Sequence, residues 1–177
     1  EACGCSPIAY MMSRSLRPRR RPEPGDIDAA SRVLASLPPG MDLLLPGSAR
    51  DLGDTLVGYR PDLMVVFGFN WRLPREVLDL PRFGVLNVHQ SALPRYRGPA
   101  PVLWAIRNGD PTIGVTVHRM DEGFDTGPVM EQVDDVPLPE DATPASVWER
   151  TGQWRPAEWC MTGLCDGRGV DVKAAIA

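Results

Sequence analysis

The hydrophobic residues along the chain follow two patterns. Short apolar runs rich in β-branched residues, bounded by polar, glycine or proline positions, are typical of strands, and apolar residues recurring every three or four positions are typical of helices. Strands are predicted at 6–12, 41–45, 62–69, 84–89, 113–120 and 127–138, helices at 26–37, 48–59, 99–110 and 143–152, and a helical turn at 74–80. This alternation predicts an α/β fold with a mostly parallel sheet and flanking helices.

Local signals sharpen three of these elements. Asp26 is predicted to cap the first helix, because a short polar side chain precedes apolar residues that recur at helical spacing from Ile27. The strand at 62–69, "DLMVVFGF", is continuously apolar, which is typical of a strand buried on both faces. Thr143 followed by Pro144 predicts the start of the last helix.

The composition is that of a globular chain. The chain has 177 residues, with 43% hydrophobic and 24% charged, enough for one domain with a core. No apolar run reaches the roughly 20 residues needed to span a bilayer, and no secretory signal is recognisable. The net charge is −4, which gives no overall attraction to DNA. Lysine occurs once, at Lys173, so arginine alone is weak evidence for a function.

The four cysteines lie near the two ends of the chain, at Cys3, Cys5, Cys160 and Cys165. Their spacings do not match the paired C-x-x-C pattern of zinc sites, so no metal is predicted. Nothing in this pattern demands an oxidising compartment, and the expected location is the cytoplasm.

Two predicted strands end in polar side chains that suit chemistry. Asn87 and His89 close the strand at 84–89, and their spacing of two places both side chains on one face. The strand at 113–120 leads into "DEGFDTG", which contains Asp125 between Phe124 and Thr126. Ligands of α/β sheets bind beyond the carboxyl ends of the strands, so these groups are candidates for one site.

An Asn, a His and an Asp that meet at such an edge suit attack of an amine on a carbonyl carbon. Asn can donate to the developing oxyanion, His can stabilise the same charge or move a proton, and a nearby Asp raises the pKa of the His and relays the proton. Each residue alone also fits a purely structural role: a packed strand-end histidine, a solvated acidic turn. The functional interpretation requires that Asn87, His89 and Asp125 lie close together in the folded chain.

The stretch from "NVHQSALPRYRG" to "DEGFDTGPV" strongly resembles the catalytic core of formyltransferases that use 10-formyltetrahydrofolate. The resemblance covers about residues 61–152, and 6–60 more weakly. Its motif pieces occur in order as Asn87–His89, Ser91–Pro94, Arg97–Gly98, Asn108–Asp110 and Asp125–Gly127. The resemblance implies a Rossmann-like fold and 10-formyltetrahydrofolate as formyl donor.

The resemblance also implies roles for individual residues. Asn87, His89 and Asp125 correspond to the catalytic trio of the family. The segments that correspond to its donor pocket and folate-binding loop give Trp71, Arg72, Leu73, His118, Met120, Asp121, Glu122, Gly123 and Phe124 as donor-binding candidates. Arg95, Arg97 and Gly98 are the candidates for contact with the acceptor.

The chain departs from the family pattern in three places. Ala92 replaces the first Leu of Ser-Leu-Leu-Pro, and Gln90 is unusual at its position. The strand and helix that open the family's fold are not found before residue 6. The resemblance ends near Gly152, so residues 1–152 are predicted to be the catalytic domain and 153–177 a divergent tail.

The acceptor stays open between an aminoacyl-tRNA of the methionyl-tRNA type and a small-molecule amine, such as an amino sugar or hydroxyornithine. The basic stretch "RSLRPRRRP" (14–22) suits phosphate contact, but it also fits a solvated loop in an arginine-rich chain. The alternatives to formyl transfer are hydrolysis of formyl-folate and an inactive chain that only binds folate or a partner. Neither a membrane nor DNA is an expected partner, and the sequence does not indicate an oligomeric state.

Overall fold

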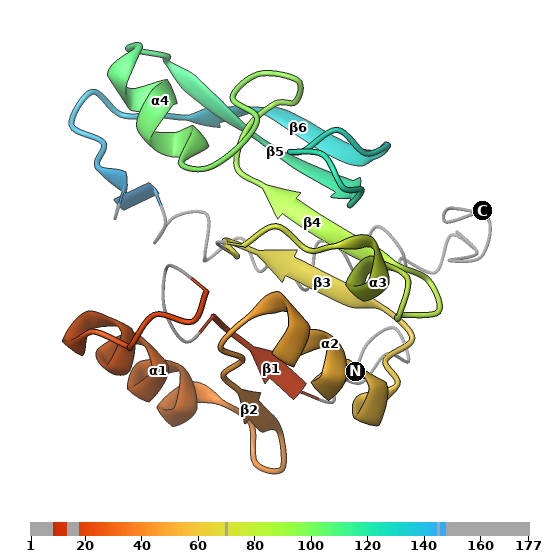
Figure 1. Ribbon diagram of the computed structural model, residues 1–177. Helices are drawn as coiled ribbons and strands as arrows, with labels where there is room; N and C mark the ends of the chain where they lie inside the picture. The colour runs from red at the N-terminus through yellow and green to blue at the C-terminus, as the bar shows by residue number, and fades with distance from the viewer. Residues whose placement is uncertain (1–8, 14–17, 70, 145, 148–177) are drawn as a thin grey trace.

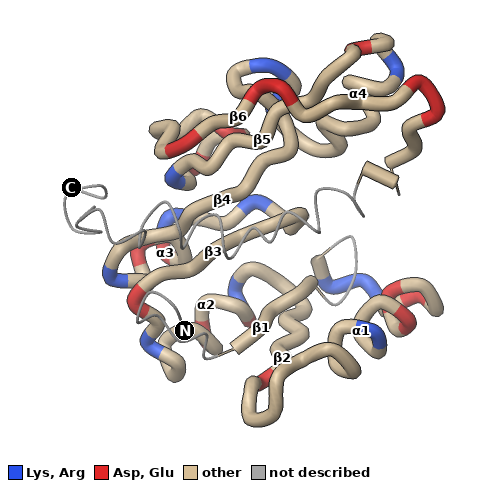
Figure 2. Tube along the Cα trace, turned by 180° about the vertical axis from the view of Figure 1, so that it is seen from behind, with Lys and Arg blue, Asp and Glu red and all other residues tan. Residues whose placement is uncertain are grey.

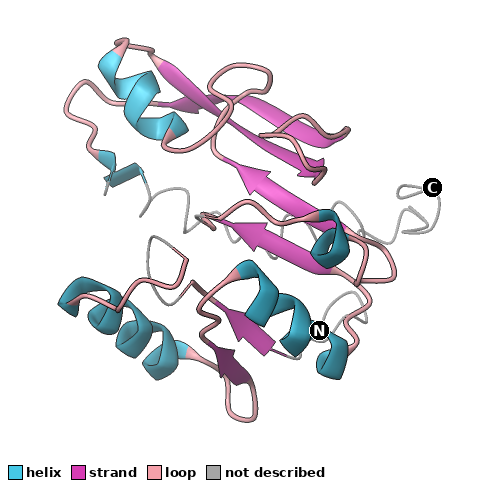
Figure 3. Cartoon of the chain, viewed as in Figure 1, coloured by secondary structure: helices cyan, strands magenta, loops and turns pink. Residues whose placement is uncertain are grey.

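The computed structural model describes residues 9–13, 18–69, 71–144 and 146–147. It has helices and strands in the order that the hydrophobic pattern predicts (Figures 1 and 3). The strands are β1 (Ala9–Met11), β2 (Asp42–Leu44), β3 (Met64–Phe67), β4 (Val85–His89), β5 (Thr112–Arg119) and β6 (Val129–Pro137). The helices are α1 (Pro24–Ser36), α2 (Ala49–Tyr59), α3 (Arg75–Leu78) and α4 (Pro101–Arg107).

The strands form two groups. β1 pairs in parallel with β2, and a second sheet has the order β3-β4-β5-β6. Within the second sheet β3 and β4 are parallel, whereas β5 runs antiparallel to both β4 and β6. The expected α/β class with flanking helices is confirmed, and the sheet around the candidate site is mixed because a nine-residue loop connects β5 directly to β6.

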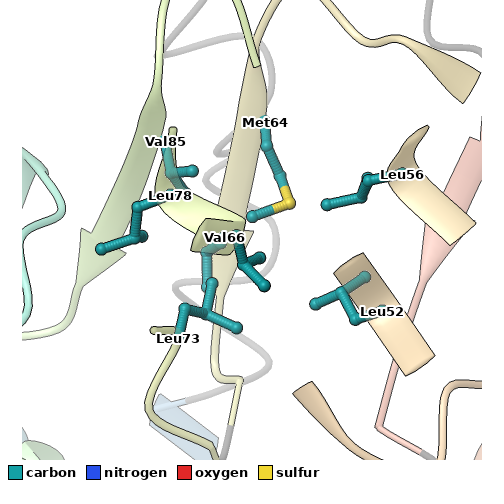
Figure 4. Close-up of a cluster of buried hydrophobic side chains, with 8 residues drawn as sticks. Leu52, Leu56, Met64, Val66, Leu73, Leu78 and Val85 are labelled. Carbon is teal, nitrogen blue, oxygen red and sulfur yellow. The ribbon is translucent and has the colours of Figure 1, made fainter. Parts of the chain in front are cut away.

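The main core lies where α2 and α3 cover β3 and β4. Figure 4 shows Leu52 and Leu56 of α2 pointing toward Met64 and Val66 of β3. Val85 of β4 is 1% exposed within this cluster. A second cluster packs α4 against β5 and β6, and a third lies between β4 and β5. The strands that carry Asn87, His89 and His118 are therefore fixed on both sides by packed side chains.

The caps of α1 and α2 differ. Ser48 caps α2 as its side chain accepts a hydrogen bond of 3.2 Å from the Asp51 amide. The prediction that Asp26 caps α1 is wrong. Glu23 is the cap residue, and Asp26 sits three positions later, where its carboxylate accepts from the Glu23 amide at 2.8 Å in a capping box. A Pro-Gly pair at 24–25 allows the helix to begin two residues before Asp26.

The expectation that β3 is buried on both faces is also wrong. Met64 and Val66 are buried, but Val65, which points to the other face, is 42% exposed. In the described chain β3 is the edge strand of its sheet, paired with β4 alone. A continuously apolar run does not by itself reveal that one face lacks a cover.

Several predictions fall partly or wholly outside the described residues. Thr143 does begin a helix: its hydroxyl accepts from the Ser146 amide at 3.1 Å, and its own amide donates to Ser146 Oγ at 3.0 Å. The four cysteines, the boundary at residue 152 and the tail at 153–177 lie outside. Within the described residues no group of side chains could hold a metal ion, and no helix is long and apolar enough to cross a membrane.

Charged positions are interspersed along the described chain. Figure 2 shows acidic and basic segments in both halves of the molecule. The described part of the basic stretch, Arg19–Arg21, comes directly before α1, where Arg20 pairs with Glu23. At least one of its arginines is thus neutralised locally.

Candidate active site

Asn87 and His89 lie on one face at the end of β4, as their spacing predicts. β4 and β5 are antiparallel, and their register places Asn87 directly opposite His118 and His89 opposite Thr116. His89 is 7% exposed and His118 is 1% exposed. The two imidazoles lie 6.5 Å apart between ring centroids. The sheet therefore presents an amide and two imidazoles to one small space.

Asp125 enters this space from the loop between β5 and β6. Its Oδ1 accepts a hydrogen bond of 3.1 Å from Asn87 Nδ2 and lies 3.6 Å from His89 Nδ1. Its Oδ2 accepts from the Gly98 amide at 2.7 Å. Side chains and backbone from three separate segments thus converge on one carboxylate. This is the convergence of Asn87, His89 and Asp125 that the strand ends suggest.

His118 belongs to the same cluster. Its Nε2 lies 3.2 Å from Asp125 Oδ1 and 3.2 Å from Asn87 Nδ2, while its Nδ1 lies 3.0 Å from the Arg119 carbonyl oxygen. The resemblance implies a donor-binding role for His118, and the geometry places it against the carboxylate. His118 lies opposite Asn87 on the neighbouring strand, so a prediction of how β4 and β5 pair could have identified it.

The electrostatics of the cluster favour an ionised Asp125. Burial alone would raise the pKa of its carboxyl group, because a charge is disfavoured away from water. The hydrogen bonds from His118 and from the Gly98 amide, with the positive charges of His89 and His118, oppose this and hold the pKa below its ordinary value. A carboxylate held in the charged form can attract and pass on a proton.

The loop that carries Asp125 is closed at its base. The Arg119 amide donates to the Pro128 carbonyl at 2.9 Å, and Gly127 lies so close to the Arg119 carbonyl oxygen that a Cβ there would collide with it. Asp125 itself has a φ of 51°, in the left-handed region that asparagine and aspartate tolerate best after glycine. The loop conformation that presents Asp125 therefore depends on glycine at 127.

The two predicted donor-binding segments meet in space. Arg72 donates to the Glu122 carbonyl oxygen and lies over the Phe124 ring, 5.0 Å from its centroid. Trp71 is 6% exposed, and its Nε1 has no hydrogen-bond partner among the described residues. A buried indole N–H without a partner is a donor available to a polar ligand. Arg72 thus joins the segment 71–73 to the loop at 122–124.

The remaining donor-binding candidates have mixed surroundings. Leu73 is buried in the main core, and Met120 packs against that core while its amide donates to the Val85 carbonyl at 2.8 Å. Asp121 Oδ1 accepts from the Gly123 amide at 2.9 Å and from Thr126 Oγ1 at 2.6 Å, which shapes the loop tip. These residues support the loop, and their contact with a donor stays a prediction.

The three acceptor candidates differ from one another. Gly98 holds Asp125 through its amide, and Arg97 is exposed. Arg95 pairs with Asp110 at 2.9 Å, next to the end of α4. A small pocket there is lined by Ser91, Ala92, Arg95, Tyr96, Asp110, Thr112, Ile113, Gly114 and Asp134. An acceptor role for Arg95 would have to compete with this ion pair.

Sequence reasoning missed the buried hydroxyl of Thr116. Its Oγ1 donates to the Ser91 carbonyl at 2.7 Å and accepts from the Leu93 amide at 3.1 Å and from Gln132 Nε2 at 2.8 Å. These bonds fix the start of the loop that follows His89. A polar residue at an inward position of an alternating strand is the signal that could have identified it.

The geometry agrees with comparisons to known proteins. A family model described as formyl transferase matches residues 47–159. The match spans more than half of the chain and includes every candidate site residue. The chain belongs to the formyl transferase family.

Curated relatives also match part of the chain. A methionyl-tRNA formyltransferase from Pseudomonas putida is 45% identical over 114 residues, which are 63% of this chain and 36% of that protein. Another, from Aromatoleum aromaticum, is 55% identical over 76 residues, 43% of this chain and 24% of that protein. The chain thus spans about a third or less of the length of these relatives.

Solved formyltransferase structures share the fold. A glycinamide ribonucleotide transformylase from Geobacillus kaustophilus has 28% identity and a TM-score of 0.60, covering 84% of this chain and 80% of that one. A sugar N-formyltransferase from a Shewanella species has 25% identity and a TM-score of 0.58, covering 93% of this chain and 57% of that one. Formyltransferases with different acceptors thus resemble this chain.

Proposed function

We propose that the chain forms the catalytic part of an enzyme that transfers a formyl group from 10-formyltetrahydrofolate to a primary amine. The observation that carries the proposal is one partly buried carboxylate, Asp125, contacted by Asn87 at 3.1 Å and facing His89 at 3.6 Å. Membership of the formyl transferase family supports the reaction type. We further propose that this catalytic part runs to residue 152 and that 153–177 forms a divergent tail.

The three residues divide the work of direct transfer. When bound, the folate supplies the formyl carbonyl that the amine attacks. One hydrogen of the Asn87 amide nitrogen bonds to Asp125, and in the mechanism the other bonds to the developing oxyanion in place of its contact with His118 Nε2, 3.2 Å away. His89, when protonated, stabilises the same negative charge, and the ionised Asp125 beside it accepts or relays the proton that leaves the amine. When the oxyanion collapses, the bond from the formyl carbon to the folate nitrogen breaks, and that nitrogen takes the relayed proton as tetrahydrofolate leaves.

The donor-binding part of the proposal rests on the contacts of Arg72 with Glu122 and Phe124, which bring 71–73 beside 122–124. Trp71 offers a buried N–H, and Arg72 offers a guanidinium already placed over the Phe124 ring. Phe124 is 55% exposed, which leaves one aromatic surface available for stacking. These features suit a flat ring system that carries polar groups.

The acceptor is proposed to be an aminoacyl-tRNA in the first place. The two curated relatives described above, at 45% and 55% identity, are named methionyl-tRNA formyltransferases. The likeness to the sugar N-formyltransferase, at 25% identity, supports a small-molecule amine as the second candidate. The charge of the described surface does not separate the two.

A panel of acceptors tests the proposal. The chain is mixed with 10-formyltetrahydrofolate and, in turn, charged initiator tRNA, an amino sugar and hydroxyornithine, and donor consumption is followed together with formylated product. We expect product with one of these, and a loss of about 10²- to 10⁴-fold in the His89→Ala variant. Arg107→Ala, an exposed change on α4, is the control and should keep full activity.

Three results would contradict the proposal. Equal donor consumption with and without every amine would indicate hydrolysis of formyl-folate, since water can take the place of the amine. Turnover that His89→Ala leaves undiminished would show that the trio does not carry the reaction. Donor binding without any turnover would indicate a chain that only binds folate.

A further inference from the structure

His89 has a contact that the proposed mechanism does not use. Its Nε2 lies 2.9 Å from the backbone carbonyl oxygen of Tyr96, seven residues along the chain. A carbonyl oxygen only accepts hydrogen bonds, so this nitrogen must carry a hydrogen. In the neutral ring the other nitrogen, Nδ1, is then the one without a hydrogen, and it faces Asp125 Oδ1 at 3.6 Å.

The Tyr96 carbonyl is held in place by the tyrosine's own side chain. The Tyr96 hydroxyl donates to Asp110 Oδ2 at 2.7 Å and accepts from Asn108 Nδ2 at 2.8 Å. Arg95 donates to the same Asp110 oxygen at 2.9 Å. Three residues, Asp110, Asn108 and Arg95, thus anchor the phenol at the end of α4.

The backbone at Tyr96 supports this view. Its φ is 53°, a left-handed conformation that bulky residues rarely adopt. Such a conformation persists when surrounding contacts determine it, and the bonds of the hydroxyl group to Asp110 and Asn108 are such contacts. Two residues later, the Gly98 amide holds Asp125 Oδ2. One short segment, 96–98, therefore contacts both His89 and Asp125 through its backbone.

We infer that Tyr96 is a positioning residue for His89. Its carbonyl fixes the hydrogen of the neutral imidazole on Nε2, which leaves Nδ1, beside Asp125, as the nitrogen that gains and loses a proton. Its hydroxyl, anchored on Asp110, keeps the carbonyl in that place. The inference rests on the proposed function for its consequence in catalysis, but the hydrogen position can be measured without any reaction.

The spectrum of the histidine side chains gives a direct test, because the chain has two histidines. In chain labelled with ¹⁵N-histidine, a nitrogen with a hydrogen and one without resonate far apart. We expect neutral His89 to carry its hydrogen on Nε2. His118 faces acceptors with both ring nitrogens, the Arg119 carbonyl oxygen at 3.0 Å and Asp125 Oδ1 at 3.2 Å, so its own hydrogen position is not part of the test. The signals that disappear in His89→Ala belong to His89.

Two variants remove the anchor in different ways. Tyr96→Phe deletes the hydroxyl, and Asp110→Ala deletes its acceptor. Each should move His89 toward a mixture of the two hydrogen positions and lower the turnover number about 10- to 100-fold, with the KM for the donor within about twofold of the parent. Tyr59→Phe is the matched control, because its hydroxyl bonds to Asp42 away from the site. It should change neither readout.

The outcomes separate this inference from the proposed function. A neutral His89 with its hydrogen on Nδ1 in the parent chain overturns the inference, as does a Tyr96→Phe variant that is folded and unchanged in both spectrum and turnover. If the parent shows the expected hydrogen position and both variants disturb it, Tyr96 positions His89 even where no acceptor is formylated. In that case the proposed function alone has failed.

Discussion

The two halves of the molecule use the same kinds of elements with different degrees of burial. In the amino-terminal part, α1 spans thirteen residues and none of them is buried, with Ile27 57% and Leu34 61% exposed. In the sheet around the candidate site, four of the five residues of β4 are buried, and Leu86 is 1% exposed. An amphipathic pattern predicts that a helix forms, but it does not show what covers the helix.

The difference in burial also explains why the candidate catalytic side chains lie on β4 and β5. Charged groups hold a fixed geometry only where packed elements support them, and the β4 and β5 strands have core on both sides. Asn87, His89 and His118 all lie on these strands. We therefore expect function and stability to depend on the sheet around the candidate site far more than on the amino-terminal part with α1.

The largest effect is expected for activity at Asp125. Asp125→Asn keeps the shape of the side chain but removes its charge, and formyl transfer should fall by about 10²- to 10⁴-fold. Donor affinity, measured by titration calorimetry, should change little. Asp26→Asn in α1 is the control and should leave the rate unchanged. A loss of affinity with an unchanged rate would make Asp125 a binding residue instead.

The next largest effect is expected for stability, when the same Leu→Ala substitution is made in β4 and in α1. Leu86→Ala in β4 leaves a cavity and should lower the free energy of unfolding by about 2–5 kcal/mol. Leu34→Ala in α1 removes a side chain that is 61% exposed and should cost no more than about 0.5 kcal/mol. Urea unfolding followed by circular dichroism measures both. Similar losses would mean that the exposed face of α1 is covered in solution.

A smaller effect concerns the helix caps. Ser48→Ala removes the cap of α2, whose Leu52 and Leu56 belong to the main core, and should cost about 1 kcal/mol of stability. Asp26→Ala breaks the capping box of α1, which has no buried residue, so it should loosen that helix locally with little change in global unfolding. Hydrogen exchange at α1 and thermal unfolding together distinguish local from global loss.

The smallest difference is expected in the response to acid. The folded-state pKa of Asp125 lies below its ordinary value, so its stabilising contribution is present above the unfolded pKa and is lost as pH falls through the folded one. Between about pH 5 and pH 2 the parent should therefore lose more thermal stability than Asp125→Asn. Asp135→Asn, an exposed change on β6, should behave like the parent. If thermal stability falls with pH in the same way in the parent and in Asp125→Asn, the lowered pKa of Asp125 is contradicted.

Sequence reasoning predicted different parts of the site for different physical reasons. Asn87 and His89 were predictable because strand geometry fixes their common face. The placement of Asp125 beside them depends on a loop with a left-handed residue and a glycine contact, and the family resemblance supplied it. Whether these residues act as proposed stays a prediction.

The Tyr96 carbonyl and the Gly98 amide could not be predicted from residue types. Every residue has a carbonyl, and its direction here depends on a positive φ at a tyrosine, which nothing in "LPRYRG" announces. Similarly, the apolar pattern predicts where β3 and α1 lie, but it predicts neither that Glu23 caps α1 in place of Asp26 nor that one face of β3 is exposed at Val65. Such errors concern the tertiary surroundings of an element, which its own sequence does not encode.

The closed base of the loop between β5 and β6 has a consequence for how this site can change over evolutionary time. Its ends are joined by the Arg119–Pro128 hydrogen bond, while the residues at its tip, 121–124, are all exposed. Substitutions at the tip can therefore change the surface that the loop exposes without disturbing the pairing of β5 with β6 beneath it. A lineage could shift its choice of ligand through a few surface substitutions and inherit the catalytic framework intact.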